Sequence, residues 1–85
     1  MSKLLNNKRK QIGEIDKEIC SLLAQRMFLS LLVADTKKEL GLKVIDEIQK
    51  EKVKQEYQKV LGDFGGKLYE LIHEESVETQ KKILG

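Results

Sequence analysis

Apolar residues recur in steps of three, four or seven over most of the first forty residues, which is the spacing of one face of an α-helix. The stretch from about Leu4 to Leu40 contains a single glycine, Gly13, and the whole chain lacks proline. The pattern therefore predicts one long amphipathic helix. Its apolar stripe consists of Ile12, Ile15, Ile19, Leu22, Leu29, Val33 and Leu40.

Two shorter helices are expected after the long one. Gly41 suits the end of the first helix because glycine readily adopts the left-handed C-cap conformation. Asp46 suits the N-cap of a second helix over about residues 47–61. Three glycines within residues 62–66 predict a turn, followed by a third helix over about residues 67–84. The fold class is therefore all-α, with one domain over residues 1–85.

The first helix is long for a chain of 85 residues. At about 1.5 Å per residue it would span roughly 55 Å, whereas a compact chain of this size has a diameter of roughly 30 Å. Part of its apolar face therefore needs cover from another copy. The simplest arrangement is a two-fold helical homodimer.

Composition narrows the class of protein further. Charged residues make up 35% of the chain and aromatic residues 5%, without tryptophan, which is typical of helical bundles. A net charge of +2 is too small to indicate nucleic-acid binding. One cysteine excludes an intramolecular disulfide, and no apolar run approaches the roughly 18 residues that cross a bilayer. We expect a soluble, cytoplasmic protein without a nucleic-acid or membrane partner.

Several polar side chains occupy apolar faces of the predicted helices. Arg26 and Lys37 lie on the stripe of the first helix, and Ser76 and Gln80, four residues apart, lie on the apolar line of the third. A cation on a core face is costly unless it is paired. Each such group alone is commonly satisfied by a neighbouring polar group. Together they indicate a shared pocket for a small anion.

Arg9 lies on a different part of the first helix from Arg26 and Lys37. Arg26 and Lys37 share a helix face and are separated by roughly 16 Å along the axis, so they could grip opposite ends of one dianion. Arg9 lies roughly 25 Å before Arg26 and points about 100° away from it. In an antiparallel dimer, Arg9 could instead complete the pocket of the partner subunit.

These residues resemble the all-helical chorismate mutases, and the resemblance covers nearly the whole chain. It implies an intertwined homodimer with two active sites, each using one arginine from the partner's long helix. The implied reaction is the rearrangement of chorismate to prephenate in phenylalanine and tyrosine biosynthesis. The residues that carry the resemblance are Leu5, Arg9, Ile12, Ile15, Asp16, Ile19, Leu22, Leu23, Arg26, Leu29, Val33, Lys37, Gly41, Val44, Asp46 and the segment 72–80.

The resemblance also implies a role for each polar residue. The reaction is pericyclic and unimolecular, so no nucleophile, general base, metal or cofactor is expected. Arg26 and Arg9 of the partner subunit would clamp the two carboxylates. Lys37 and Gln80 would donate to the breaking ether oxygen as it gains negative charge, and Ser76 would help to hold a carboxylate.

The start of the second helix, at Asp46, would meet the ring hydroxyl. The family usually has Arg-Glu three and four positions further on, where this chain has Gln49 and Lys50, with Glu51 next. Without a gap, Lys50 replaces a carboxylate that normally accepts from the ring hydroxyl. With a one-residue shift, Lys50 and Glu51 replace the pair. The apolar spacing that follows favours the ungapped alignment, so Lys50 is assigned to the substrate site.

Two other functions fit the same residues. A related lyase could eliminate pyruvate from isochorismate with the same cations, and a helical module without activity could dock on a partner enzyme of the shikimate pathway. The buried-face positions of Arg26, Lys37, Ser76 and Gln80 favour a ligand pocket over a plain coiled coil. His73 is expected to be a surface or helix-contact residue without a role in the reaction.

Overall fold

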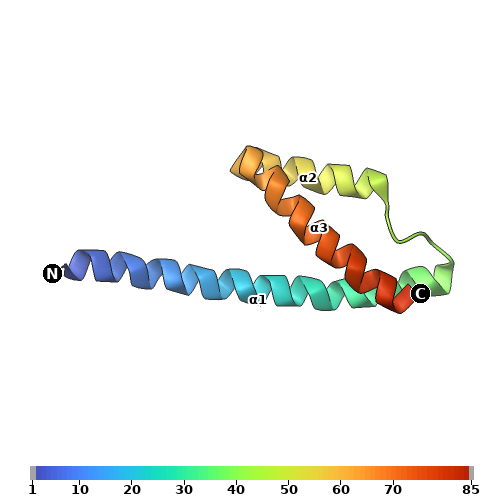
Figure 1. Cartoon of the computed structure of the whole chain (residues 1–85), viewed down its shortest axis with the longest axis horizontal. Helices are drawn as coiled ribbons and strands as arrows, with labels where there is room; N and C mark the ends of the chain where they lie inside the picture. Colours follow the sequence, from blue (N-terminus) through green and yellow to red (C-terminus); the bar gives the residue numbers. More distant parts are fainter. Residues whose placement is uncertain (1, 85) are drawn as a thin grey trace.

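The computed structural model describes residues 2–84, which form three helices (Figure 1). They are α1 (Lys3–Leu40), α2 (Glu47–Leu61) and α3 (Asp63–Leu84). The all-α fold and the long first helix are confirmed. The chain measures 59 × 23 × 14 Å, and its radius of gyration is 16.7 Å, against about 12 Å for a compact chain of this length.

The predicted helix caps are confirmed at the connection between α1 and α2. Gly41 adopts the left-handed conformation with φ of 68°, and its amide donates to the carbonyls of Lys37 and Lys38. The Asp46 carboxylate accepts a hydrogen bond from the Gln49 amide at 3.1 Å, which satisfies one of the free N–H groups at the start of α2. These caps fix where the two helices stop and start on either side of the cavity described below.

The predicted turn over residues 62–66 is wrong, and α3 begins four residues earlier than expected. The turn is made by Gly62 alone, with φ of 69°, while Gly65 and Gly66 are buried inside α3. A Cβ on Gly65 would lie 2.2 Å from the Tyr57 carbonyl oxygen of α2. These glycines therefore allow the backbones of α2 and α3 to cross closely, and this packing offsets their low helix propensity.

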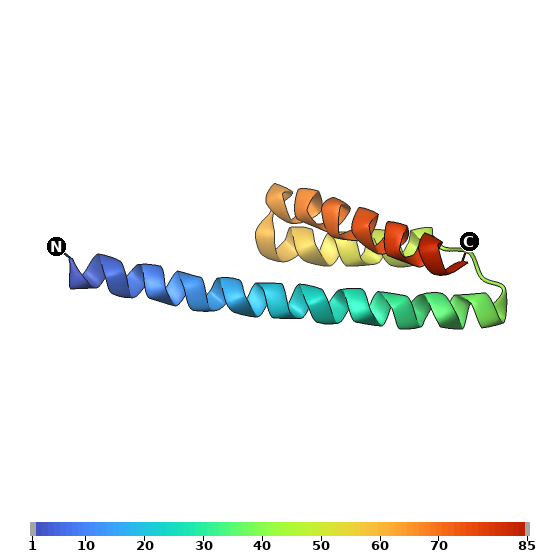
Figure 2. The same ribbon diagram turned by 60° about the horizontal axis from the view of Figure 1, so that its bottom comes forward.

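Helix α3 packs on both α1 and α2, whereas α1 and α2 make no direct approach within residues 2–84. Both shorter helices lie over the C-terminal half of α1, so that its N-terminal half extends beyond them (Figures 1 and 2). In the described part of the chain, the buried apolar residues are Ala34 and Tyr69. Such a small core leaves the apolar stripe of α1 largely uncovered, with Ile12, Leu22 and Leu29 exposed by 59%, 62% and 57%.

Contrary to the expectation that no apolar run is long enough to cross a bilayer, helix α1 contains an 18-residue window with mean hydropathy 1.4, which makes it long and apolar enough to do so by length and composition. The core helix of a soluble protein meets the same criterion. The polar groups described next lie on α1 and pair with side chains of α3, so this helix forms part of a packed bundle.

Candidate active site

A cavity of about 290 Å³ lies between α1 and α2, with α3 forming its third wall. The cations and the polar pair predicted from the sequence all reach it, from helices far apart along the chain. Three cationic residues and one anionic residue line the cavity, so its formal charge favours an anion. The lining consists of Arg26, Ser30, Val33 and Lys37 from α1, Val44 and Asp46 from the connection, Gln49, Lys50 and Val53 from α2, and Tyr69, His73, Ser76, Val77 and Gln80 from α3.

Arg26 is joined to α3 through Ser76. The Arg26 Nη1 donates to Ser76 Oγ at 2.6 Å, and Ser30 Oγ donates to the same oxygen at 3.4 Å. Because Ser76 accepts both bonds, its own hydroxyl proton remains free to donate. The other N–H groups of the guanidinium are likewise free for a ligand. This corner of the cavity therefore presents converging donors, as an anionic oxygen requires.

Lys37 is joined to Gln80 at the other end of the cavity. Its ammonium donates to Gln80 Oε1 at 3.0 Å and to the carbonyl of Val44. An ammonium has three donors and no acceptor, so one N–H remains for a ligand. It also requires the oxygen of the Gln80 amide to face it, which leaves the amide NH₂ group available as a second donor. Two donors at this end therefore remain without a partner in the described chain.

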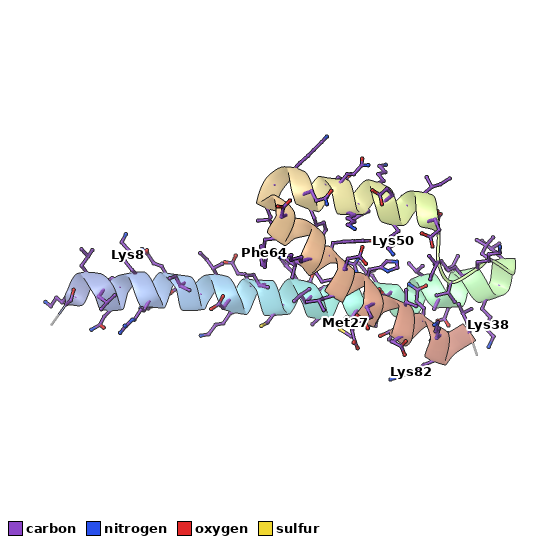
Figure 3. The ribbon with its side chains drawn as sticks, turned by 45° about the horizontal axis from the view of Figure 1, so that its top comes forward. Lys8, Met27, Lys38, Lys50, Phe64 and Lys82 are labelled. Carbon is purple, nitrogen blue, oxygen red and sulfur yellow. The ribbon has the colours of Figure 1, made fainter. Side chains whose placement is uncertain are left out.

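The wall formed by the start of α2 consists of the residues that the ungapped alignment predicts. Asp46, Gln49 and Lys50 line the cavity and Glu51 does not, and Figure 3 shows Lys50 on the side of α2 that faces the other helices. The Lys50 ammonium lies 3.8 Å from Glu70 of α3. Lys54, one turn further along α2, lies 3.0 Å from the same carboxylate. The hydrogen bond from Lys54 lowers the pKa of Glu70 and raises that of Lys54.

Three lining residues were missed by the sequence interpretation: Ser30, Tyr69 and His73. The His73 ring lies 5.6 Å from Tyr69, and Tyr69 lies edge-on to Tyr57 of α2 at 5.1 Å. Burial raises the pKa of Tyr69. Helical spacing contained the signal, because Ser30 lies four residues after Arg26, and Tyr69 and His73 lie seven and three residues before Ser76.

Arg9 does not reach this cavity from its own chain. It lies on the exposed N-terminal half of α1, where Figure 3 shows its neighbour Lys8 far beyond α2 and α3. The structure thus brings together Arg26, Lys37, Asp46, Lys50, Ser76 and Gln80, and leaves Arg9 apart from them.

The structure is therefore an all-helical fold with a cationic cavity between one long helix and two short ones, and the charge of this cavity favours a small anion as its ligand. The chain matches the family Chorismate mutase type II over residues 8–81 and belongs to that family.

The chain is similar to two bifunctional proteins. It is 40% identical to the bifunctional chorismate mutase/prephenate dehydratase of Buchnera aphidicola subsp. Schizaphis graminum (strain Sg), over 83 residues that cover 89% of this chain and 21% of that protein. The same protein of Buchnera aphidicola subsp. Acyrthosiphon pisum (strain APS) is 39% identical, with the same coverage. The chain thus spans about a fifth of the length of these curated relatives. No solved structure gives a significant match.

Proposed function

We propose that the chain is a chorismate mutase, which rearranges chorismate to prephenate in the cytoplasm. One observation carries the proposal: two cations of α1 face one cavity and are held there by neutral side chains, Arg26 by Ser76 at 2.6 Å and Lys37 by Gln80 at 3.0 Å. Neutral partners leave the positive charge uncompensated. Such a pocket favours a small dianion, and chorismate carries two carboxylates.

Substrate binding is assigned to the Arg26 end of the cavity. The guanidinium suits forked pairing with a carboxylate, and the free hydroxyl proton of Ser76 adds a donor to the same group. Holding both carboxylates would keep the substrate folded in its reactive shape, which lowers the entropic part of the barrier. Asp46 and Lys50 would meet the ring hydroxyl from the start of α2.

Catalysis is assigned to the Lys37 end. The free N–H of Lys37 and the NH₂ group of Gln80 would both donate to the ether oxygen of the breaking bond. Negative charge grows on that oxygen in the transition state, so these donors bind the transition state better than the substrate. Donors that are already in place need no reorganisation when the charge develops.

The working unit of this proposal is an intertwined homodimer in which Arg9 of the partner subunit clamps the second carboxylate. Support comes from the exposed stripe of α1, from the extended shape of the chain, and from the distance between Arg9 and its own cavity. The apolar surface that α3 leaves uncovered is the kind that another copy buries. Burial of this surface by another copy also accounts for the high hydropathy of α1 without a membrane.

The direct test is to incubate purified protein with chorismate and follow its loss by absorbance, with identification of the product. Prephenate formation well above the spontaneous rate supports the proposal. A rate equal to the spontaneous background would favour a docking module. Conversion of isochorismate to pyruvate and salicylate, with no prephenate from chorismate, would favour the related lyase.

Sharing of sites between subunits is tested by mixing two inactive variants, Arg9→Ala and Arg26→Ala. A heterodimer has one site with both lesions and one site with neither. After complete subunit exchange, half of the dimers are heterodimers, so about a quarter of the wild-type activity should return. No recovery despite exchange proven by mass spectrometry would contradict shared sites.

A further inference from the structure

The cavity contains many hydrogen-bond donors and few acceptors. Arg26, Lys37 and Lys50 only donate, and the Gln80 oxygen already accepts from Lys37 at 3.0 Å. Chorismate, on which this inference rests through the proposed function, also carries a ring hydroxyl. A hydroxyl donates one hydrogen bond as well as accepting. Binding is weaker if this proton has no acceptor in the site. The wall near Lys50 therefore needs an acceptor.

His73 occupies a suitable position for this acceptor. It lines the same cavity as Lys50 and Ser76, and its ring makes a tilted contact with the ring of the buried Tyr69, with the two centroids 5.6 Å apart. Tyr69 is in turn supported by Tyr57 of α2. Within residues 2–84, the imidazole takes part in none of the side-chain hydrogen bonds of the structure. Its acceptor nitrogen is therefore available to a ligand.

We propose that the neutral imidazole of His73 accepts a hydrogen bond from the ring hydroxyl of the substrate, while Lys50 donates to the oxygen of the same group. The two residues face the hydroxyl from different helices, α3 and α2. Together they match its single proton and its lone pairs, which a cation alone does not do.

The electrostatics around His73 keep the imidazole neutral near pH 7. Its pKa is lowered, first by burial and then by Lys50, with a smaller contribution from Arg26 of α1, while Glu70 and Glu47 act in the opposite direction. Asp46 and Lys37 are the other charged groups that line the cavity. Protonation at lower pH removes the acceptor, so the proposed contact is present above the pKa of His73 and is lost as the pH falls through it.

Asp46 is the competing acceptor. One of its carboxylate oxygens already accepts from the Gln49 amide at 3.1 Å as the cap of α2, and the residue is exposed. Water therefore competes for its second oxygen. Asp46→Asn keeps a capping oxygen and removes the charge, so it tests Asp46 as the alternative acceptor of the same hydroxyl proton.

The first experiment measures kcat/KM for chorismate across pH in wild type, His73→Leu, His73→Gln, His73→Asn and Asp46→Asn. His73→Leu should lower kcat/KM by about ten- to a hundredfold at pH 7.5. One of the two amide variants should restore most of it, because its side-chain oxygen is an acceptor that does not titrate. The wild type should show a fall in kcat/KM at acidic pH, and that variant should lose it. A merely structural role for His73 would not move this pH profile.

The second experiment uses the fact that His73 is the single histidine of the chain, so its imidazole NMR signals need no assignment among several residues. With the product prephenate bound at pH 7.5, the imidazole should remain unprotonated. An imidazolium in this complex would overturn the proposal. So would an active His73→Leu variant with an unchanged pH profile, particularly if Asp46→Asn lost activity. Wild-type protein without mutase activity would instead overturn the proposed function itself.

Discussion

The two halves of α1 have the same amphipathic pattern and different surroundings. The C-terminal half, from about Arg26 onward, lies under α2 and α3 and contributes four residues to the cavity. The N-terminal half extends beyond both helices (Figure 2), with an apolar stripe that α3 does not cover. Spacing of apolar residues therefore predicts the helix in both halves equally, but it does not say which other helix covers each half.

The arginines of the two halves show the same contrast. Arg26 is partly buried and held by Ser76, whereas Arg9 is exposed on the free half. Arg26 interrupts the apolar stripe and Arg9 flanks it. A charge in such a position is costly in a packed helix unless it is paired. The covered arginine already lines the cavity, and in the proposed dimer the uncovered one completes the cavity of the second copy.

The largest expected effect comes from Arg26→Ala, which removes the cation of the covered half. The variant should lose about a hundred- to a thousandfold in kcat/KM, as for the loss of a charged donor in a closed site. Alanine favours helix, so circular dichroism should show unchanged helix content. Lys38→Ala removes the same charge from an exposed position of α1 and should keep full activity. Normal turnover by Arg26→Ala would contradict the site.

A smaller effect, on the free energy of unfolding, is expected when Gly65 in the packed part of α3 is compared with Gly13 in the uncovered half of α1. A Cβ at Gly65 would meet the backbone of Tyr57 at 2.2 Å, whereas a Cβ at Gly13 has nothing within 4 Å in the chain. Gly65→Ala should therefore lower the free energy of unfolding by about 1–3 kcal/mol. Gly13→Ala should raise it by about 0.5–1 kcal/mol.

Both glycine variants should be compared by urea denaturation at one fixed protein concentration, because the stability of the proposed dimer would depend on concentration. Destabilisation by Gly13→Ala would show that another copy approaches this glycine closely. Wild-type stability in Gly65→Ala would contradict the close crossing of α2 and α3.

The sequence was sufficient for everything that depends on local pattern. Helical spacing predicted α1, and the capping chemistry of Gly41 and Asp46 correctly predicted the C-terminal end of α1 and the start of α2. It failed at Gly65 and Gly66, because low helix propensity there is outweighed by the close approach of another helix, which is a tertiary effect. It also did not place His73 in the cavity, because a lone histidine on a helix gives no sign that Lys50 of another helix lines the same cavity.

The smallest expected effect is a difference in the free energy of unfolding between alanine variants of two serines of α1, both of which take part in hydrogen bonds. Ser30 is buried and donates to Ser76 at 3.4 Å, while Ser21 is exposed and accepts from Gln25 at 3.2 Å. Ser30→Ala should lower the free energy of unfolding by about 0.5–1.5 kcal/mol, because a buried hydrogen bond is lost without replacement by water. Ser21→Ala should change it by less than about 0.5 kcal/mol.

Both serine variants gain the same small helix propensity from alanine, so this term cancels in the comparison. The difference between them therefore reports the surroundings of α1 rather than the helix itself. Equal effects would indicate that another copy buries Ser21 as deeply as α3 buries Ser30. Hydrogen exchange of the amides around Ser21, measured over a range of protein concentrations, would then show protection that increases as the proposed dimer forms.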